Sequence, residues 1–322
     1  MEEKLVNILN EMADYLNISQ MKRLQEVLID NLCNGRAQKE QVSNEEYLRL
    51  FLDAKKIEGC SLRTLQYYEV TVKHMLNNLD TPIRKMTTDE IRTYLVAYQQ
   101  INNCSKVTVD NVRRNISSFF SWLEEEDYIL KSPMRRIHKI KTKTVVKETI
   151  SDEGIEQLRD HCTQLRDIAI IDLLYSTGIR VGELVNLNIE DVDLEQRECV
   201  VFGKGDKERR VYFDAKTKIH LKEYLDLRSD CNPALFVSLD APFNRLMISG
   251  VEIRLRELGR LVGLNKIHPH KFRRTMATRA IDRGMPIEQV QKILGHSQID
   301  TTMQYAIVNQ NNVKNSHRRY IA

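Results

Sequence analysis

The sequence has few of the features that mark membrane, metal-binding or disulfide-rich proteins. No stretch approaches the ~20 consecutive apolar residues that a membrane-spanning helix needs, so we expect no membrane association. The six cysteines are scattered, with no C-x-x-C pair and no grouping with histidine, which argues against a zinc site and a disulfide framework. Internal repeats and low-complexity tracts are missing too. The composition is otherwise ordinary, and 322 residues are enough for two domains with a core each.

The first residues do not have the pattern of a secretion signal. The start, MEEKLVNILNEM, is acidic and interrupted by polar residues, whereas a signal peptide begins with a basic region followed by an apolar one. We therefore expect a cytoplasmic protein.

Acidic residues are missing from one stretch near the middle of the chain. The net charge of +4 is by itself a weak argument for a nucleic-acid partner. From residue 131 to residue 147, however, the sequence KSPMRRIHKIKTKTVVK has seven basic residues and no acid. They are Lys131, Arg135, Arg136, Lys139, Lys141, Lys143 and Lys147. Such a strip either neutralises phosphates with release of their counterions or forms a solvated basic linker.

Proline and glycine are sparse before residue 130, and the apolar spacing there follows the helical period. Residues 4 to 33 suggest two short helices. From Ser43 to about Tyr128 the pattern predicts four helices with good start signals: Ser61, Ser105, and a capping box of Thr87 with Glu90. Two of these helices carry residues suited to DNA contact, which equally fit the ordinary charged covering of a helix. These residues are Arg63, Lys73, Arg113 and Arg114.

The pattern changes after the basic strip. Ser151, followed by two acids, starts a helix, and a later helix, TQLRDIAIIDLLYST, ends at Gly178. The segment ECVVFGKGDKERRVYF alternates about a glycine-containing turn as a β-hairpin does, and we expect helices to resume from Ser249. The predicted fold is mainly α with a small β-sheet. It divides into a helical extension (1–42), a helical domain (43–130), a basic linker (131–149) and an α+β domain (150–322).

Four short strings in the last domain carry groups suited to chemistry on a phosphodiester. They are TGIRVGEL with Arg180, FGKGDKER with Lys204, HPHKFRR with His270 and Arg273, and LGHSQIDTTMQY with His296 and Tyr305. Breaking and rejoining DNA without ATP requires the bond energy to be stored, which an ester between a side chain and the phosphate accomplishes. Arginine suits the charged transition state, because its planar fork holds two oxygens and stays protonated.

Proton transfer requires further groups. A tyrosine hydroxyl with a pKa of ~10 must lose its proton during attack, so an imidazole with a pKa of ~6.5 is a sensible acceptor. His270 precedes Arg273 by three residues, a spacing that puts both side chains on one helix face. Lys204, between two glycines of a hairpin turn, is placed to protonate the leaving oxygen. Taken singly, each of these residues has an ordinary structural explanation, such as an ion pair, a solvated charge or packing.

As a set, the four strings resemble the conserved boxes of the tyrosine recombinase family in order and internal spacing. The resemblance covers roughly residues 43 to 322 and is strong only in the second domain. It implies a SAM-like core-binding domain and a catalytic domain that close on DNA as a C-shaped clamp. It makes Tyr305 the nucleophile, Arg180 and Arg273 the phosphate clamp, Lys204 the general acid, His270 the general base and His296 a hydrogen-bond donor to the phosphate. No metal and no other cofactor is implied.

The resemblance also implies partners and leaves alternatives open. The partners are double-stranded recombination sites and a homo-tetramer on two such sites, formed from monomers when DNA binds. Residues 306–322 would dock on a neighbouring protomer, and an accessory DNA-bending or excisionase protein would assist. We expect integration or excision of a mobile element; the alternatives are Xer-type dimer resolution, DNA inversion, a type IB topoisomerase-like relaxer and a non-catalytic DNA-binding protein.

Two features depart from the family pattern. Arg274 follows the second clamp arginine where the family often has histidine, and residues 1–42 extend beyond the shortest Xer-type recombinases. The first leaves the role of that position open, and the second leaves the subfamily open.

Overall fold

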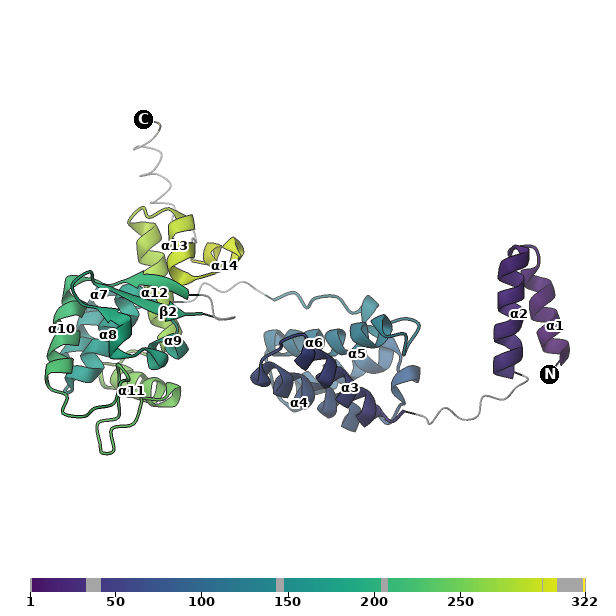
Figure 1. Ribbon diagram of the computed structural model, residues 1–322, viewed down its shortest axis with the longest axis horizontal. Coiled ribbons are helices and arrows are strands. Elements are labelled where there is room, and N and C mark those ends of the chain that lie inside the picture. Colours follow the sequence, from purple (N-terminus) through teal and green to yellow (C-terminus); the bar gives the residue numbers. More distant parts are fainter. Residues whose placement is uncertain are drawn as a thin grey trace. The chain divides into compact units, whose positions relative to one another are not determined.

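The computed structural model describes residues 2–32, 42–142, 148–203, 208–296, 298–305 and 321 of the chain. The chain forms two compact units, residues 1–144 and 145–322 (Figure 1). Helices predominate in both, and a small sheet lies in the second, so the prediction of a mainly helical protein with a small sheet is confirmed. Within the described ranges, no helix combines the length and apolar character needed to cross a membrane.

The first unit is entirely helical over its described residues. Its α-helices are α1 (Glu2–Met12), α2 (Ile18–Leu32), α3 (Asn44–Ile57), α4 (Leu62–Asn78), α5 (Thr88–Ile101) and α6 (Lys106–Glu125), with 3-10 turns η1 (Ile83–Lys85) and η2 (Pro133–Arg136). The predicted start signals are the observed N-caps. The Ser61 hydroxyl accepts from the amide of Thr64 at 3.3 Å, and the Glu90 carboxylate accepts from the amide of Thr87 at 2.7 Å, which closes the capping box.

Aromatic side chains dominate the core of this unit. Phe51 of α3 and Phe119 of α6 are fully buried, and their rings meet edge to face with centroids 5.3 Å apart. Trp122, one turn further along α6, packs against Phe51 as well, with centroids 5.6 Å apart. The long helix α6 therefore organises the core, and its opposite face is left to polar residues.

The second unit has a helical body and a short sheet. Its elements are α7 (Asp152–Asp160), α8 (Leu165–Thr177), α9 (Val181–Asn186), η3 (Ile189–Asp191), β1 (Val192–Asp193), β2 (Glu198–Phe202), β3 (Glu208–Tyr212), α10 (Ala215–Asp226), α11 (Ile248–Leu261), α12 (Pro269–Asp282), α13 (Ile287–Leu294) and α14 (Ile299–Met303). The predicted hairpin is present: β2 pairs antiparallel with β3, with Val200 opposite Arg210. The short strand β1, which the sequence analysis does not anticipate, pairs with the other edge of β2.

Helix α8 is the centre of this unit. Its sequence LRDIAIIDLLYST is apolar around most of its circumference, and Ile171, Leu173 and Leu174 are fully buried. It packs against both α10 and α12. The C-terminal end of α8 is therefore held in position, and so is the start of the loop that follows it.

The expectation that helices resume only at Ser249 is wrong. Helix α10 begins at Ala215, directly after Asp214, whose carboxylate accepts from the amide of Thr217 at 2.8 Å as an N-cap. The buried stripe of α10 is narrow, since its buried residues are Thr217, Leu221 and Tyr224. A stripe of this kind among many polar residues gives a weak periodic signal.

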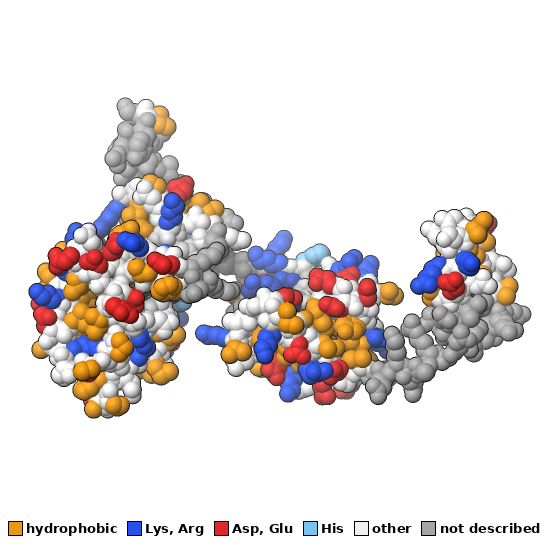
Figure 2. Space-filling model, viewed as in Figure 1, with side chains coloured by type: hydrophobic (Ala, Val, Ile, Leu, Met, Phe, Trp, Pro, Cys, Tyr) orange, Lys and Arg blue, Asp and Glu red, His pale blue; other side chains and the backbone are white. Residues whose placement is uncertain are grey.

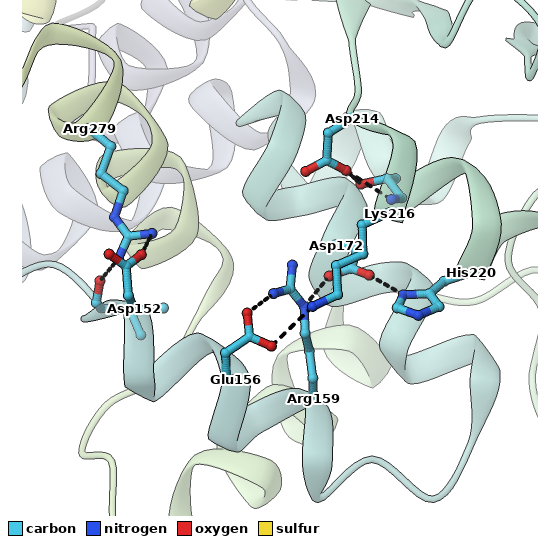
Figure 3. Close-up of polar contacts among 10 residues, drawn as sticks. Asp152, Glu156, Arg159, Asp172, Asp214, Lys216, His220 and Arg279 are labelled. Carbon is cyan, nitrogen blue, oxygen red and sulfur yellow. Dashed lines mark hydrogen bonds and ion pairs between the residues drawn. The ribbon is translucent and has the colours of Figure 1, made fainter. Parts of the chain in front are cut away.

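A buried polar network fixes α8 to α7 and α10 (Figure 3). Asp172 of α8 is fully buried, and its carboxylate accepts from Nε of Arg159 at 2.6 Å and pairs with Nδ1 of His220. Arg159 also pairs with Glu156, which accepts from Nζ of Lys216 at 3.0 Å. Every charge in this network has an opposite partner, as burial requires.

The same network extends to α12 through an aromatic ring. The guanidinium groups of Arg159 and Arg279 lie 5.8 and 5.1 Å from the centroid of the Tyr175 ring, both within cation–π range. Arg279 of α12 also pairs with Asp152 at the start of α7, as the close-up shows (Figure 3). The last turn of α8 is thereby held relative to α12, and these two elements carry the functional groups described next.

Candidate active site

The first group of the site lies where α8 ends. Gly178 has the left-handed backbone conformation, with φ of 64°, which ends the helix and turns the chain. Arg180 follows and begins α9: its backbone amide donates to Oε2 of Glu183 at 2.8 Å, and its Nη1 donates to Oε1 at 2.9 Å. The Arg180 side chain keeps 35% of its surface exposed. Glu183 therefore holds both the backbone amide of Arg180 and one terminal nitrogen of its guanidinium.

Glu183 is a buried anion that two arginines share. Nη1 and Nη2 of Arg209, on β3, donate to its two oxygens at 2.8 and 2.7 Å. Burial alone would raise the pKa of Glu183, but the hydrogen bonds from Arg209 and from the Arg180 amide outweigh it and lower this pKa below its ordinary value. Glu183 is therefore ionised near neutral pH.

Arg273 joins the end of α8 to the end of α13. Its side chain extends from α12; Nη1 donates to the carbonyl of Gly178 at 2.7 Å, and Nη2 donates to the carbonyl of Leu294 at 2.5 Å. Only 3% of the residue is exposed. Burial, followed by the charge of Arg180, lowers the pKa of Arg273 to about 10, so the group stays protonated at neutral pH.

His296 lies beside this guanidinium. Gly295, again left-handed with φ of 64°, ends α13 and turns His296 inward. Nη2 of Arg273 lies 3.0 Å from Nε2 of His296, and Nδ1 of His296 lies 2.8 Å from the Thr302 hydroxyl. Because a guanidinium only donates, Nε2 accepts, which assigns the proton of a neutral ring to Nδ1. Burial, then the charges of Arg273, Arg180 and Arg209, lower the pKa of His296 to about 4, which agrees with a neutral ring.

Tyr305 completes the cluster. Its ring stacks on that of His296, with centroids 6.1 Å apart and planes 28° from parallel. The ring also packs against a small apolar cluster of α12 and α13 that contains Val290 and Leu294. Its hydroxyl interacts electrostatically with the guanidinium of Arg273. The phenol ring therefore lies against His296, which in turn contacts the buried guanidinium of Arg273.

Helix α12 carries two more residues that the sequence analysis singled out. His270 lies one turn before Arg273 and is exposed; partial burial of its ring, then the charges of Arg273 and Arg180, lower its pKa below the ordinary value. Arg274 points to another task, because its Nε and Nη2 donate to the backbone carbonyl of Glu148 at 2.9 and 2.6 Å. It anchors the segment that enters the second unit.

The structure thus brings together residues that are far apart in the sequence. Of the predicted catalytic set, the connected residues are Arg180, His270, Arg273, His296 and Tyr305. Lys204 lies outside the described residues. Sequence reasoning missed Arg209 and Thr302 as partners of this cluster. Arg209 lies within the noted string FGKGDKER, and its signal was a charge placed on a strand that packs against α8 and α13.

The predicted DNA-contact residues differ in how free their charges are. Arg63 and Lys73 on α4 are exposed. Arg114 on α6 is exposed too, but its Nε lies 3.8 Å from Asp110, and Arg113 pairs with the same Asp110 at 2.8 Å with 12% of its side chain exposed. In the basic strip, Arg135 pairs with Glu124 at 2.7 Å. Arg136, Lys139 and Lys141 are exposed, and Lys143 and Lys147 lie outside the described residues. Their contact with DNA stays a prediction.

Comparison with protein families decides what this cluster belongs to. The family model described as "Phage integrase family" matches residues 136–312, which is more than half of the chain. The chain belongs to this family. A second model, "Phage integrase, N-terminal SAM-like domain", matches residues 47–130. The resemblance to tyrosine recombinases is therefore confirmed, and so is the predicted class of enzyme, which cleaves and rejoins DNA strands.

Curated relatives of this phage integrase family member match along most of their length. The chain is 33% identical over 276 residues to "Tyrosine recombinase XerC" of Thermodesulfovibrio yellowstonii, which covers 81% of this chain and 91% of that protein. It is 30% identical over 295 residues to the protein of the same name from Staphylococcus haemolyticus, covering 85% and 98%.

Solved structures of the family share the fold. The Tn1549 transposon integrase in complex with transposon right end DNA aligns with a TM-score of 0.72 and 17% identity, covering 86% of this chain and 99% of that one. A lambda integrase dimer bound to a COC' core site aligns with a TM-score of 0.68 and 18% identity, covering 88% and 85%. These similarities confirm the predicted fold of a SAM-like domain and a catalytic domain.

Proposed function

We propose that this tyrosine recombinase is site-specific and works through a 3′-phosphotyrosyl intermediate at Tyr305 and a Holliday junction. The observation that carries the proposal is the convergence of a buried, protonated Arg273 with His296 and the ring of Tyr305 at one place. A nucleophile beside a fixed cation is the arrangement that a negatively charged phosphodiester needs.

The proposed phosphate clamp consists of Arg180 and Arg273. Arg273 uses some of its N–H donors on the carbonyls of Gly178 and Leu294, so its plane is fixed before the substrate arrives. A guanidinium has five donors, which leaves others for phosphate oxygens. Arg180 contributes a partly exposed guanidinium, of which one terminal nitrogen is held by Glu183.

The proposed proton transfers use His270 and Lys204. The lowered pKa of His270 keeps its ring neutral at neutral pH, so it is able to accept the proton of the attacking hydroxyl. Lys204 protonates the leaving oxygen. His296 would donate to the phosphate, which requires a proton on the Nε2 that accepts from Arg273 in the free protein. A bound phosphate favours that proton, because a nearby anion raises the pKa of an imidazole.

The proposed substrate is double-stranded DNA that carries recombination sites. The exposed basic side chains of α4, α6 and the basic strip would help to bind it. Two such sites would be joined by a homo-tetramer in which residues 306–322 dock on a neighbouring protomer. We place this reaction in the cytoplasm, with an accessory DNA-bending or excisionase protein as a further partner. The proposed role is integration or excision of a mobile element.

One experiment tests the nucleophile. The chain is incubated with nicked suicide duplexes made from the inverted repeats in the DNA flanking its gene, and the covalent adduct is measured by denaturing gel. We expect an adduct with the parent and with Tyr212→Phe, whose tyrosine is exposed on β3, and none with Tyr305→Phe. An adduct that persists in Tyr305→Phe would move the nucleophile to another residue.

Xer-type dimer resolution is a second candidate role. It is favoured by the curated relatives, which are named XerC and are matched over nine-tenths or more of their length. Plasmids that carry two sites separate the roles. Resolution of directly repeated identical sites favours the Xer-type role, whereas joining of two different sites on separate molecules favours integration.

A further inference from the structure

Arg209 occupies a position between the groups that the proposed reaction uses. It is the second residue of β3 (Glu208–Tyr212), and 12% of its side chain is exposed. Its two terminal nitrogens hold both oxygens of Glu183 at 2.8 and 2.7 Å. Its Nε donates to the carbonyl of Ile293 at 2.9 Å, next to the Leu294 carbonyl that holds Arg273. The guanidinium of Arg209 therefore contacts both Glu183 of α9 and the C-terminal end of α13.

The side chain of Arg209 also packs closely against the backbone at the end of α13. A side chain at Gly295 would meet Cδ of Arg209 at 3.0 Å and its Nε at 3.1 Å, so the arginine stem lies directly on the glycine backbone. Gly295 is the residue that turns His296 toward Arg273. The stem of Arg209 thus supports the turn, while its charged end serves Glu183.

Arg180 and Arg209 share one carboxylate unequally. Among the described residues, the guanidinium of Arg180 has a single hydrogen-bond partner, Oε1 of Glu183, at 2.9 Å. Arg209 forms the two-pronged pair, which is the stronger geometry for a guanidinium and a carboxylate. With Arg209 absent, the buried anion would be left with one partner, and buried charges without full compensation are costly. Arg180, which already donates once to Glu183, would then be drawn into further hydrogen bonds with it.

We propose that Arg209 is a positioning residue that saturates Glu183 and thereby keeps the guanidinium of Arg180 available for the phosphate. The inference rests on the proposed function, since it assigns Arg180 to the phosphate clamp. It assigns Arg209 no contact with DNA. Its effect on the reaction passes through Glu183 and Arg180.

The test uses the full chain and single-turnover cleavage of a nicked suicide duplex at saturating protein. Arg209→Met keeps the stem over Gly295 and removes the fork. We expect cleavage to slow by at least ~10-fold, in the range found for loss of a positioned charge, with DNA affinity within about twofold of the parent. The matched control is Arg210→Met on the next residue of β3, because Arg210 is 61% exposed and pairs with Glu198. We expect the control to cleave like the parent.

A second substitution separates positioning from mere structural support. Glu183→Gln removes the charge that would capture Arg180 but keeps an oxygen for the Arg180 amide. The double variant Glu183→Gln with Arg209→Met is therefore expected to cleave several-fold faster than Arg209→Met alone, since interacting residues give non-additive effects. Parental cleavage by Arg209→Met, or a double variant no faster than the single one, would overturn the proposal.

The pKa of His296 gives a further readout of the Arg209→Met variant. The charge of Arg209 is one of those that depress the pKa of His296, so NMR titration of this ring should give a higher pKa in Arg209→Met and an unchanged one in Arg210→Met.

If Arg209→Met does not fold, Arg209→Lys supplies charge without the fork, and we expect slow cleavage that Glu183→Gln restores. Cleavage by the parent that is lost in Tyr305→Phe keeps the proposed function intact whatever Arg209 does.

Discussion

Arg273 is a buried cation held chiefly by carbonyl oxygens. Its contacts with Gly178 and Leu294 fix the plane of the guanidinium, and Arg180 nearby adds a second positive charge. Burial is the main cause of the lowered pKa of Arg273, and the charge of Arg180 is the next, so two cations close together are unfavourable in the free protein. A phosphate between them would relieve this repulsion. The site is therefore organised for an anion before the anion binds.

Replacing Arg273 by lysine keeps the charge and removes the fork. We expect Arg273→Lys to lower the cleavage rate by about 100-fold with little change in DNA affinity, because an ammonium cannot hold two oxygens in one plane. Single-turnover cleavage and a binding titration measure the two effects separately. Arg283→Lys is the control, since Arg283 is exposed at the end of the same helix. A fully active Arg273→Lys variant would remove Arg273 from the clamp.

His296 makes the stability of the second unit depend on pH. Its pKa in the folded protein is about 4, below the ordinary 6.5, so the unfolded chain binds more protons between these values. The free energy of unfolding should therefore rise as the pH increases from about 4 to 6.5, and this contribution is fully present above that range. Because the ring is half-exposed and screened, we expect about 1–2 kcal/mol from a pKa difference of this size.

Urea unfolding between pH 4 and pH 7 measures this contribution. The difference between the parent and His296→Gln should grow across the window, because glutamine does not titrate. His138→Gln replaces an exposed histidine of the first unit and should leave the pH dependence unchanged. Parallel curves for the parent and His296→Gln would show that His296 contributes nothing to the pH dependence.

Single residues also show where sequence reasoning ends. The candidate residues Arg180, His270, Arg273, His296 and Tyr305 stand in recognisable strings, so their identity could be predicted. Their partners could not. Arg209 donates to a carbonyl 84 residues away, a contact that depends on tertiary packing and not on spacing along the chain. Thr302 stands in the same string as His296, but the string alone does not show that its hydroxyl contacts the ring.

Among helices and strands, the accuracy of prediction follows how local the signal is. The N-caps at Ser61, Thr87 and Ser105 act within three residues, and the structure has helices beginning after each. Helix α10 lacks a broad apolar stripe, and β1 has two residues, so neither has a strong periodic pattern. Both are stabilised by their neighbours, α8 for α10 and β2 for β1.

The turn between α8 and α9 offers a test of how helix ends serve the site. Gly178 and Gly263 both have positive φ, of 64° and 70°, but a Cβ at Gly178 would meet Cε of Met276 at 2.3 Å whereas one at Gly263 meets nothing within 4 Å. Alanine at either position costs about 1 kcal/mol for the left-handed backbone. Gly178→Ala should cost more, because Met276 must move.

The two variants should differ further in activity. The Gly178 carbonyl holds Nη1 of Arg273, so we expect Gly178→Ala to slow cleavage by about tenfold or more, as for other losses of site geometry. Gly263→Ala, which shares the backbone strain without the contact, should cleave like the parent. Thermal melts and single-turnover cleavage of both variants make the comparison. Equal cleavage by the two would separate the turn from the function of Arg273.

For the whole molecule, the cores of the two units differ in composition. The first has an aromatic core around Phe51 and Phe119, and the second an aliphatic one around α8. Apolar periodicity is enough to predict such cores. The site is different, because it needs the ends of α8 and α13 and the side chain of Arg273 in one place. That requirement acts across more than 100 residues, from Gly178 to Leu294, which no local pattern encodes.

The basic strip between the units should determine the salt dependence of DNA binding. Each neutralised phosphate releases counterions, and for duplex DNA the slope of log affinity against log salt changes by about 0.9 per contact. Arg136 is exposed, and its backbone carbonyl accepts from Arg92 at 3.1 Å, so its side chain is available to a phosphate. Arg135 is already paired with Glu124 at 2.7 Å and must leave that partner to bind DNA.

These contacts predict an unequal effect of two adjacent substitutions. Arg136→Ala should weaken binding and flatten the salt dependence by about one contact. Arg135→Ala should do so less, because its charge is partly neutralised by Glu124 in the free protein. Titrations at several salt concentrations measure both slopes, with Lys222→Ala on α10 as a control that replaces an exposed charge outside the strip. Slopes that match the parent for both arginine variants would mean that the strip does not contact phosphates and serves as a solvated linker.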